Sequence, residues 1–386
     1  MANNIITVGL GWGDEGKGAT VDFLCRAYKS KTVIRYSGGH QCGHNVVTED
    51  GRSHTFSQFG SGTLAGANTF LLRDVLIEPH ALFNESVHLE KLGVNRPLDK
   101  LWVHPKCVVT TKYHRLFNRA LSAIENNGTC GLGIGLTRFT ALRGVSVYPN
   151  DDLDTIMDKL YQIRAILEDH YYSRDSENTA GLVDLLKTTE ANHGLSVPRV
   201  AHNLHDALRR IQVSEPHYDD ETVVFEGAQG MALNEYTGYN SKESTWGNVT
   251  IRNALEFLEE GGGSEKCHVL GIARCYATRH GGVLPWPEIH GFGDPGNPDN
   301  PYQGKIYAYR WNINYLEWCK ATSCTDSVAL NHLDHAQELG LDHTEVCRVR
   351  QLCDPVSVVG RGRSAVDRTI EKDRIVFNDL GLYDPV

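Results

Sequence analysis

Short apolar runs alternate along the chain with stretches of helical periodicity. Residues 5–8 form an apolar run with the length of a buried strand, and residues 19–28 have the spacing of a helix. Further strand-like segments occur at 32–36, 101–109, 222–225, 268–273 and 327–330. This alternation predicts an α/β fold with a central, largely parallel sheet and flanking helices.

Two stretches depart from this alternation. Residues 151–207 are polar and carry apolar residues at helical spacing, namely Leu153, Ile156, Leu160, Ile163 and Leu167. This pattern predicts a helical insertion. Residues 285–301 are too rich in proline and glycine for regular structure, which is typical of a binding loop or of a plain surface excursion. Because no linker or internal repeat divides the sequence, we expect a single domain over 1–386.

Composition narrows the classes of function. A chain of 386 residues with 40% hydrophobic content can bury a large core. The net charge of −10 argues against nucleic-acid and anionic membrane partners. Ten cysteines without a CxxC pair, and an N-terminus without a secretion pattern, favour reduced thiols in a cytoplasm. No apolar run reaches the ~20 residues that span a bilayer.

The segment 8–18 nearly spells a phosphate-binding loop between the first strand and the first helix. Gly11 is followed at Walker A spacing by Gly16 and Lys17, but Gly18 stands where a Ser or Thr is usual. Free N–H groups at the helix start and the Lys17 ammonium suit a phosphate. Asp14 would repel phosphate unless it holds a metal or acts as a base. The alternative is a glycine-rich turn with solvated acids.

Three more glycine-rich segments indicate a broad nucleotide cleft. Residues 38–44 follow a predicted strand, and His44 can donate a proton or face a leaving phosphate, although a lone histidine is more often structural. Residues 128–135 contain a loose GxGxG pattern, which is weak evidence because no strand precedes it. Residues 225–230 follow another strand, and the Gln229 amide can read a base edge.

Five segments together resemble the adenylosuccinate synthetases in identity and order. They are Gly11-Trp-Gly-Asp-Glu-Gly-Lys-Gly18, Gly38-Gly-His-Gln-Cys-Gly-His44, Phe225-Glu-Gly-Ala-Gln-Gly230, Tyr276-Ala-Thr-Arg-His-Gly281 and Asp367-Arg-Thr369. The resemblance spans nearly the whole chain. It implies that family's fold and a ligase that joins the amine of L-aspartate to C6 of a purine nucleoside monophosphate, with a nucleoside triphosphate as co-substrate.

The resemblance also implies roles for individual residues. Asp14 would take the N1 proton of a 6-oxopurine, so that O6 attacks the γ-phosphate, and would bind Mg²⁺ together with the Gly43 carbonyl. His44 and Lys17 would stabilise the transferring phosphoryl group. Aspartate would then displace phosphate from C6.

Other positions would contact nucleotides in a protein of this family. They are Gly13, Glu15, Gly16, Gly18, Gln41 and Gln229, with Thr129 or Cys130 and Ser244 or Thr245 at the 5′-phosphate. Asp334, in the segment 331–334, would accept from guanine N1 and N2, although an ordinary strand-to-loop boundary has the same pattern. The family forms homodimers, in which Arg138 or Arg143 would reach across to the nucleotide phosphate.

Several departures from the usual cellular pattern cluster around substrate recognition. Gln41 and Cys42 replace Asn-Ala, Cys130 replaces Thr and Ala19 replaces Lys. The aspartate-binding run is replaced by residues 304–311, where Arg310 is the best candidate to clamp a carboxylate and Lys305 to assist.

These departures resemble the viral branch of the family, the 2-aminoadenylosuccinate synthetases, which act on (d)GMP. They favour (d)GMP in the cytoplasm of a host cell, with IMP as the alternative. One feature points the other way, because some viral members replace the carboxylate equivalent to Asp14. For the donor, Asp334 favours GTP, whereas the viral branch and His332 in place of a lysine favour ATP or dATP.

Two other classes compete with the ligase. A nucleotide-binding regulatory GTPase module would use residues 11–18 and 331–334 without an aspartate site. A dinucleotide-dependent oxidoreductase is disfavoured because the ribose-binding acid after Gly16 is missing.

Overall fold

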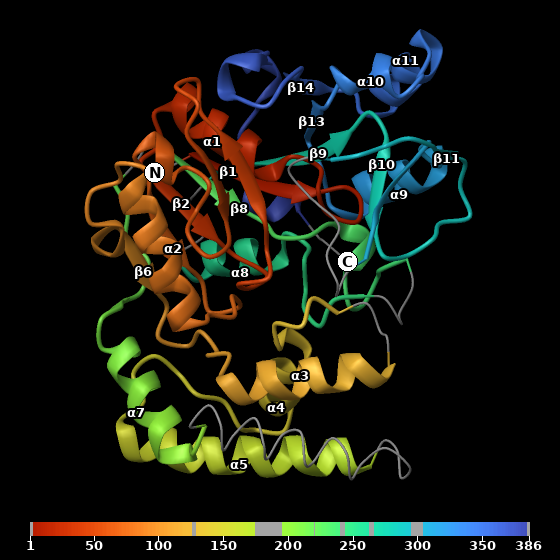
Figure 1. Ribbon diagram of the computed structural model, residues 1–386. Helices are drawn as coiled ribbons and strands as arrows, with labels where there is room; N and C mark the ends of the chain where they lie inside the picture. The colour runs from red at the N-terminus through yellow and green to blue at the C-terminus, as the bar shows by residue number, and fades with distance from the viewer. Residues whose placement is uncertain are drawn as a thin grey trace.

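The computed structural model confirms the predicted α/β class, with helices packed on a large sheet (Figure 1). It describes residues 3–125, 129–173, 195–219, 221–239, 244–261, 266–294 and 304–383. The sheet order is β15-β14-β13-β9-β1-β8-β2-β5-β6-β7, with β16 beside β9. Pairing is parallel except at β15 and β16, which run antiparallel to β14 and β9.

The strands of this sheet are β1 Asn3–Gly9, β2 Thr32–Arg35, β5 Asn68–Leu71, β6 Leu101–Val103, β7 Gln212–Val213, β8 Thr222–Glu226, β9 Lys266–Arg274, β13 Ser327–Asn331, β14 Val356–Gly360, β15 Arg368–Ile370 and β16 Asn378–Asp379. A small antiparallel sheet contains β10 Ala277–His280, β11 Glu288–Ile289 and β12 Ile306–Tyr309, and a hairpin contains β3 His44–Val47 and β4 Ser53–Phe56.

The α-helices are α1 Lys17–Tyr28, α2 Pro79–Lys91, α3 Lys112–Glu125, α4 Ile134–Leu142, α5 Leu153–Tyr172, α7 Val197–Leu208, α8 Arg252–Glu260, α9 Ile313–Thr322, α10 His335–Glu338 and α11 His343–Leu352. Short 3-10 turns lie at Thr63–Ala65, Pro97–Lys100, Met231–Leu233, Ala365–Asp367, Lys372–Arg374 and Leu380–Leu382.

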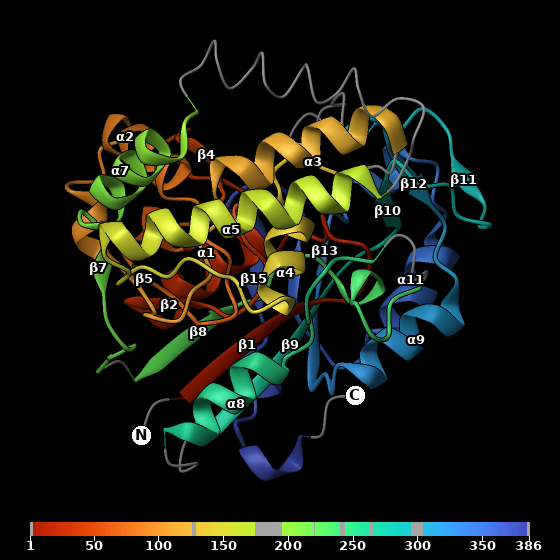
Figure 2. The same ribbon diagram turned by 90° about the horizontal axis from the view of Figure 1, so that it is seen from below.

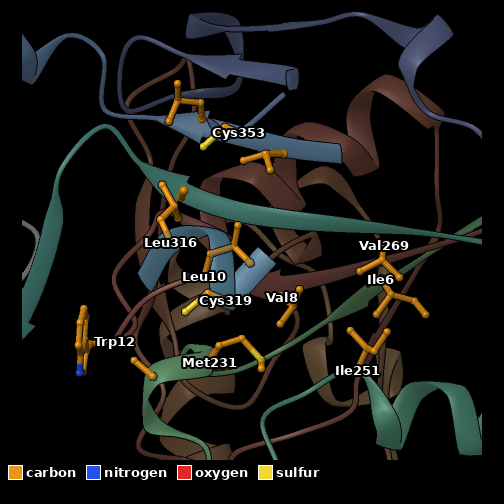
Figure 3. Packing of buried hydrophobic residues seen from close by; sticks show 14 of the residues in the cluster. Ile6, Val8, Leu10, Trp12, Met231, Ile251, Val269, Leu316, Cys319 and Cys353 are labelled. Atoms are coloured by element: carbon orange, nitrogen blue, oxygen red, sulfur yellow. The ribbon is translucent and has the colours of Figure 1, made fainter. Parts of the chain in front are cut away.

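Successive side chains of β1 pack into hydrophobic cores on opposite faces of the sheet. Ile5 belongs to the core cluster of Val21 and Leu24 from α1, whereas Ile6 belongs to the cluster of Leu258 from α8. Successive strand residues point to opposite faces, so a continuous apolar run is what a strand covered on both sides requires. Figure 3 shows the second cluster, where Ile6 and Val8 lie near side chains from β9 and the segment before α8.

A separate group of helices lies below the sheet in Figure 1. It contains α3, α4, α5 and α7, and Figure 2 shows α5 running alongside α3. In α5 the apolar face holds Ile156, Leu160, Ile163 and Leu167, each at most 1% exposed. Of the stretch 151–207, residues 174–194 lie outside the described residues.

Two segments differ in part from what the sequence predicts. The strand expected at 101–109 ends at Val103, because Pro105 follows and the chain turns through a hydrogen bond from Cys107 N–H to the His104 carbonyl. The proline-rich loop at 285–301 is described as far as 294 and contains the two-residue strand β11. Within the described ranges, no helix is long and apolar enough to cross a membrane.

Candidate active site

The side-chain carboxylate of Glu15 bridges residues within the loop between β1 and α1. Oε1 of Glu15 accepts from the N–H groups of Gly11 and Gly13 at 3.0 and 2.8 Å. Oε2 accepts from Lys17 Nζ at 2.6 Å, and both side chains are buried. Groups predicted to bind phosphate are therefore preorganised around an internal anion.

Asn331 ties this loop to the end of β13. Its Nδ2 donates to the Glu15 carbonyl at 3.1 Å and to Thr20 Oγ1 at 3.0 Å. The sequence placed Asn331 in a base-reading segment, but the structure uses its amide to hold the loop. Gly16 is required here, because its φ is 92° and a Cβ would lie 3.0 Å from the Asn331 amide nitrogen.

Gly18 is also explained by close packing. A Cβ at this position would lie 2.9 Å from His44 Cβ and from the Asn45 carbonyl oxygen. The position that Walker A loops give to a Ser or Thr therefore serves here to bring the start of α1 against β3.

Asp14 stands at the turn of the same loop in a left-handed conformation, with φ 63°. Its carbonyl accepts a short hydrogen bond from Arg274 Nε, and its Oδ2 lies 3.7 Å from His280 Nε2. Burial raises the pKa of Asp14, while the positive charges of Arg274, His280 and Lys17 oppose the increase. A carboxylate with a raised pKa is a better proton acceptor than a solvated one.

His44 is oriented by a buried carboxylate. Its Nδ1 forms a short hydrogen bond with Oε1 of Glu226, the last residue of β8. Burial by itself would raise the pKa of Glu226, but His44, Arg35 and the Ser61 hydroxyl lower it to about 2. The ionised Glu226 fixes the imidazole with Nδ1–H as donor and leaves Nε2 to meet a ligand.

The sequence did not single out Glu226 or Arg274. Glu226 lies inside the glycine-rich segment 225–230, so its position was available as a signal. Ser61, which donates its N–H to Glu226 at 2.9 Å, lies 165 positions away in the sequence. No local pattern could have paired these residues.

A narrow, largely filled pocket lies between the loops that follow β2 and β8. Its walls are Gly38, Gln41, Leu76, Ile134, Arg138, Gln229, Thr245, Trp246, Gly247, Asn248 and Val249. Both amide atoms of Gln41, Oε1 of Gln229 and Nε of Arg138 are buried there without a hydrogen-bond partner in the described structure. Buried polar atoms normally have partners, so this pocket has the donors and acceptors of a ligand site.

Only one of the residues expected at a 5′-phosphate is among the residues that line this pocket. Thr245 lines the pocket, whereas Thr129, Cys130 and Ser244 do not. The Thr129 hydroxyl donates to Asn118 Oδ1 at 3.1 Å and accepts from Gly131 N–H at 3.2 Å, which shapes the loop before α4. Burial raises the pKa of the Cys130 thiol.

The two arginines of α4 have different surroundings. Arg138 lines the pocket and donates through Nη2 to the Asp74 carbonyl at 2.9 Å. Arg143 is exposed at the end of α4, with its guanidinium 3.5 Å from the Phe139 ring centroid. Within one chain, Arg138 and not Arg143 is brought to the pocket.

The residues proposed to bind aspartate lie apart from the pocket lining. Arg310, after β12, forms an ion pair with Glu345 of α11, and Lys305 is exposed. Asp334 lies at the start of α10, where its Oδ2 is 3.5 Å from His335 Nε2. His332, two positions before Asp334, is half-buried, and desolvation of its ring lowers its pKa well below the usual value.

Asp14 and Gly43 offer the hard oxygen donors that Mg²⁺ prefers. The Asp14 side chain is 25% exposed, and Gly43 lies at an exposed position just before His44. Since Mg²⁺ usually keeps several waters and takes one or two carboxylates, this donor set fits the ion. No cluster of three or more His, Cys, Asp or Glu ligands occurs in the part of the chain that the structure describes.

Sequence comparison assigns most of the chain to one family model. The model described as adenylosuccinate synthetase matches residues 6–289. The Vibrio cholerae adenylosuccinate synthetase is 30% identical over 301 residues, covering 74% of this chain and 65% of that protein. The Neisseria gonorrhoeae enzyme is 30% identical over 386 residues, covering 95% and 83%. The chain thus spans about 65% of the length of the first of these relatives.

Two solved structures have the same fold. The fully ligated adenylosuccinate synthetase from Plasmodium falciparum matches with a TM-score of 0.72 and 16% identity, covering 95% of this chain and 99% of that one. The cyanophage S-2L succinoaminodeoxyadenylate synthetase, bound to dGMP and dATP as an energy donor, matches with a TM-score of 0.63 and 17% identity, covering 96% and 95%.

Proposed function

Because this chain belongs to the adenylosuccinate synthetase family, we propose that it is a ligase joining L-aspartate to C6 of a 6-oxopurine nucleotide. A nucleoside triphosphate is hydrolysed to the diphosphate and phosphate in the process. The observation that carries the proposal is the Asp14 carboxylate, held in the middle of a phosphate-binding loop with a raised pKa. A loop that only bound phosphate would gain nothing from this charge.

In the first step, Asp14 takes the N1 proton of the purine. The electrons released make O6 a nucleophile, which attacks the γ-phosphorus as the bond to the diphosphate breaks. Lys17 and the loop N–H groups stabilise the phosphoryl oxygens, and His44 Nε2 hydrogen-bonds the leaving group. In the second step, the aspartate amine attacks C6, loses a proton and expels phosphate.

Mg²⁺, when bound to oxygens of Asp14 and Gly43, supplies further neutralisation of phosphate charge. The residues that hold Asp14 act independently of the ion. Arg274 binds its carbonyl and fixes the direction of the loop turn, and His280 lies on the side of Oδ2.

We propose a guanine nucleotide, GMP or dGMP, as the purine substrate, which places the chain with the viral branch. Guanine carries a 2-amino group that needs an acceptor, and Oε1 of Gln41 and Oε1 of Gln229 are buried acceptors in the same pocket. A site built around such acceptors loses binding energy with hypoxanthine, which has no 2-amino group. IMP with GTP, giving adenylosuccinate, is the second candidate.

For the donor we propose ATP or dATP, because the cyanophage protein of the same fold binds dATP; Asp334 favours GTP instead. Aspartate would be captured by Arg310, with Lys305 assisting, if its carboxylate replaces Glu345 as the arginine's partner. We propose a homodimer, in which the exposed Arg143 is available to a second copy. A cytoplasmic location is proposed because all ten cysteines are free thiols.

The decisive experiment offers each purine with each donor. The protein is incubated with Mg²⁺, L-aspartate, one of IMP, GMP or dGMP, and one of GTP, ATP or dATP, and succinyl-purine is detected by mass spectrometry. We expect product with GMP or dGMP. Triphosphate binding without product from any purine refutes the ligase, and hydrolysis that does not need aspartate supports the regulatory module instead.

A variant pair tests the purine site. Gln41→Leu removes two buried amide atoms from the pocket, and we expect the KM for the purine nucleotide to rise about tenfold with little change for the triphosphate. Gln351→Leu, at an exposed position of α11, is the matched control. Equal KM values in the two variants would remove Gln41 from purine recognition.

A further inference from the structure

A continuous series of polar contacts links the base-reading candidate Asp334 to the proposed base Asp14. At its centre is the hydroxyl of Tyr276, between β9 and β10. This hydroxyl accepts from Arg274 Nη1 at 2.9 Å and lies 2.8 Å from Nδ1 of His335. Since the arginine can only donate, the tyrosine proton is directed to His335.

The Arg274 end of the series is rigid. The side chain is buried, and its Nη2 donates to Asp294 Oδ2 at 3.0 Å. Its Nε donates to the Asp14 carbonyl, at the residue with φ 63°. A shift of this guanidinium therefore acts directly on a backbone position that few residues adopt without support.

At the Asp334 end of the series, the side chains are partly exposed to solvent. Nδ1 of His335 accepts from Tyr276, so Nε2 carries the hydrogen and lies 3.5 Å from Asp334 Oδ2. The side chains of Asp334 and His335 are 32% and 28% exposed, so a ligand can reach them. Asp334 is the N-cap of α10, a helix of four residues, and His335 is its first residue.

Aromatic contacts hold the rings of Tyr276 and His335 against each other. The Tyr276 ring is stacked on the His335 ring with centroids 6.2 Å apart, and it meets Phe292 edge-on at 5.6 Å. A displacement of His335 is therefore passed to Tyr276 by ring contact as well as by the hydrogen bond.

We propose that His335, Tyr276 and Arg274 are positioning residues that couple occupancy of the donor base site at Asp334 to the orientation of Asp14. The inference rests on the proposed ligase function. A guanine donor base, whose N1–H and 2-amino groups pair with Asp334, changes the partner of His335, and the change reaches the Asp14 carbonyl through Tyr276 and Arg274. An adenine donor base has no N1–H and leaves the contact between Asp334 and His335 in place. Donor identity then affects the rate of phosphoryl transfer in addition to donor binding.

The test is a double-mutant cycle with Tyr276→Phe and Asp334→Asn. The phenylalanine keeps the ring contacts and removes only the hydroxyl. With GTP as the donor, we expect Tyr276→Phe to lower kcat about tenfold, the effect of losing one hydrogen bond to a charged group. Because donor occupancy and the orientation of Asp14 are linked, the donor Kd should change by no more than the same factor. In the Asp334→Asn background the same change should lower kcat less than about twofold, because the coupling is already broken.

Two further variants separate the coupling from a general effect of substitution in this region. His335→Phe keeps a ring at the same place and should abolish the coupling as Tyr276→Phe does. Tyr307→Phe, in the neighbouring β12, should leave kcat within about twofold of the wild type. Thermal unfolding of every variant verifies that the fold is retained.

A second readout is donor selectivity. The ratio of kcat between the better and the poorer donor should fall towards one in Tyr276→Phe, and by the same linkage the ratio of their Kd values should move in the same direction. If the wild type is active and the two substitutions multiply independently, the coupling is overturned alone. If the wild type forms no succinyl-purine, the ligase proposal fails and the coupling fails with it.

Discussion

The ammonium nitrogen of Lys17 lies 2.6 Å from Oε2 of Glu15, inside the loop that begins α1. The other carboxylate oxygen accepts from two loop N–H groups. The cation and the N–H groups expected to bind a phosphate are therefore balanced by an internal negative charge. A phosphate entering this loop must share or replace the contacts of Glu15.

Replacing Glu15 by Gln should destabilise the fold. The substitution leaves the Lys17 ammonium buried without its carboxylate, and loss of one partner of a buried ion pair costs about 3 kcal/mol. Urea unfolding measures the change. The control is Glu168→Gln, which breaks the half-exposed pair with Arg164 on α5 and should cost under about 1 kcal/mol. Equal losses in the two variants would contradict a structural role for the buried pair.

Asp14→Asn should remove turnover and leave the fold intact. Asparagine adopts the left-handed conformation at φ 63° at least as readily as aspartate, but its amide cannot take the purine proton. Product formation and the Tm are measured together. Asp14→Ala should in addition lose about 1 kcal/mol of stability, because alanine is strained at this φ. Near-normal turnover in Asp14→Asn would exclude Asp14 as the base.

Gly230→Ala should distort the loop between β1 and α1, which Gly230 contacts from the segment after β8. A Cβ at Gly230 would lie 2.3 Å from the Gly11 carbonyl oxygen and 2.6 Å from Glu15 Oε1. Overpacking of this kind typically costs about 1–3 kcal/mol. The variant should also bind triphosphate more weakly in a calorimetric titration. Gly293→Ala has open space around its Cβ and is the control. A Gly230 variant as stable as this control would show that the loops can move apart.

Stability should fall in acid through buried neutral histidines. Burial lowers the pKa of His114 to about 3, whereas an unfolded histidine has a value near 6.5. The unfolded chain therefore binds the proton first as the pH falls below about 6.5. The loss reaches about 1.4 kcal/mol per pH unit for this residue between the two values.

The check is urea unfolding of the wild type and His114→Gln between pH 7 and 5. Nδ1 of His114 accepts from Thr111 N–H at 3.0 Å, so the glutamine variant is expected to be less stable at pH 7. Its stability should nevertheless change less with pH. A parallel pH dependence in the two proteins would mean that His114 does not account for the acid sensitivity.

Local patterns were sufficient where one element decides the structure. The apolar run at 5–8 and the glycines that follow it predicted a buried strand, a loop and a helix, and β1 and α1 occupy these places. The strand predicted through residue 109 was too long, because a hydrophobic pattern by itself does not predict the turn at Pro105. The sequence predicts Asn331 in a base-reading segment, but nothing near it in the sequence shows that its amide also donates to the Glu15 carbonyl.

The sequence by itself determined the fold class, which follows from hydrophobic periodicity, and the family, which follows from the identity and order of five short segments. It also located the glycine-rich loop between β1 and α1. Only the tertiary structure decided which charges meet. Glu226 orients His44, and Arg274 holds the Asp14 carbonyl, through contacts between residues far apart in the sequence. Such contacts arise when parallel strands bring their carboxyl ends to one edge of a sheet, where the order of strands and not the order of residues sets the neighbours.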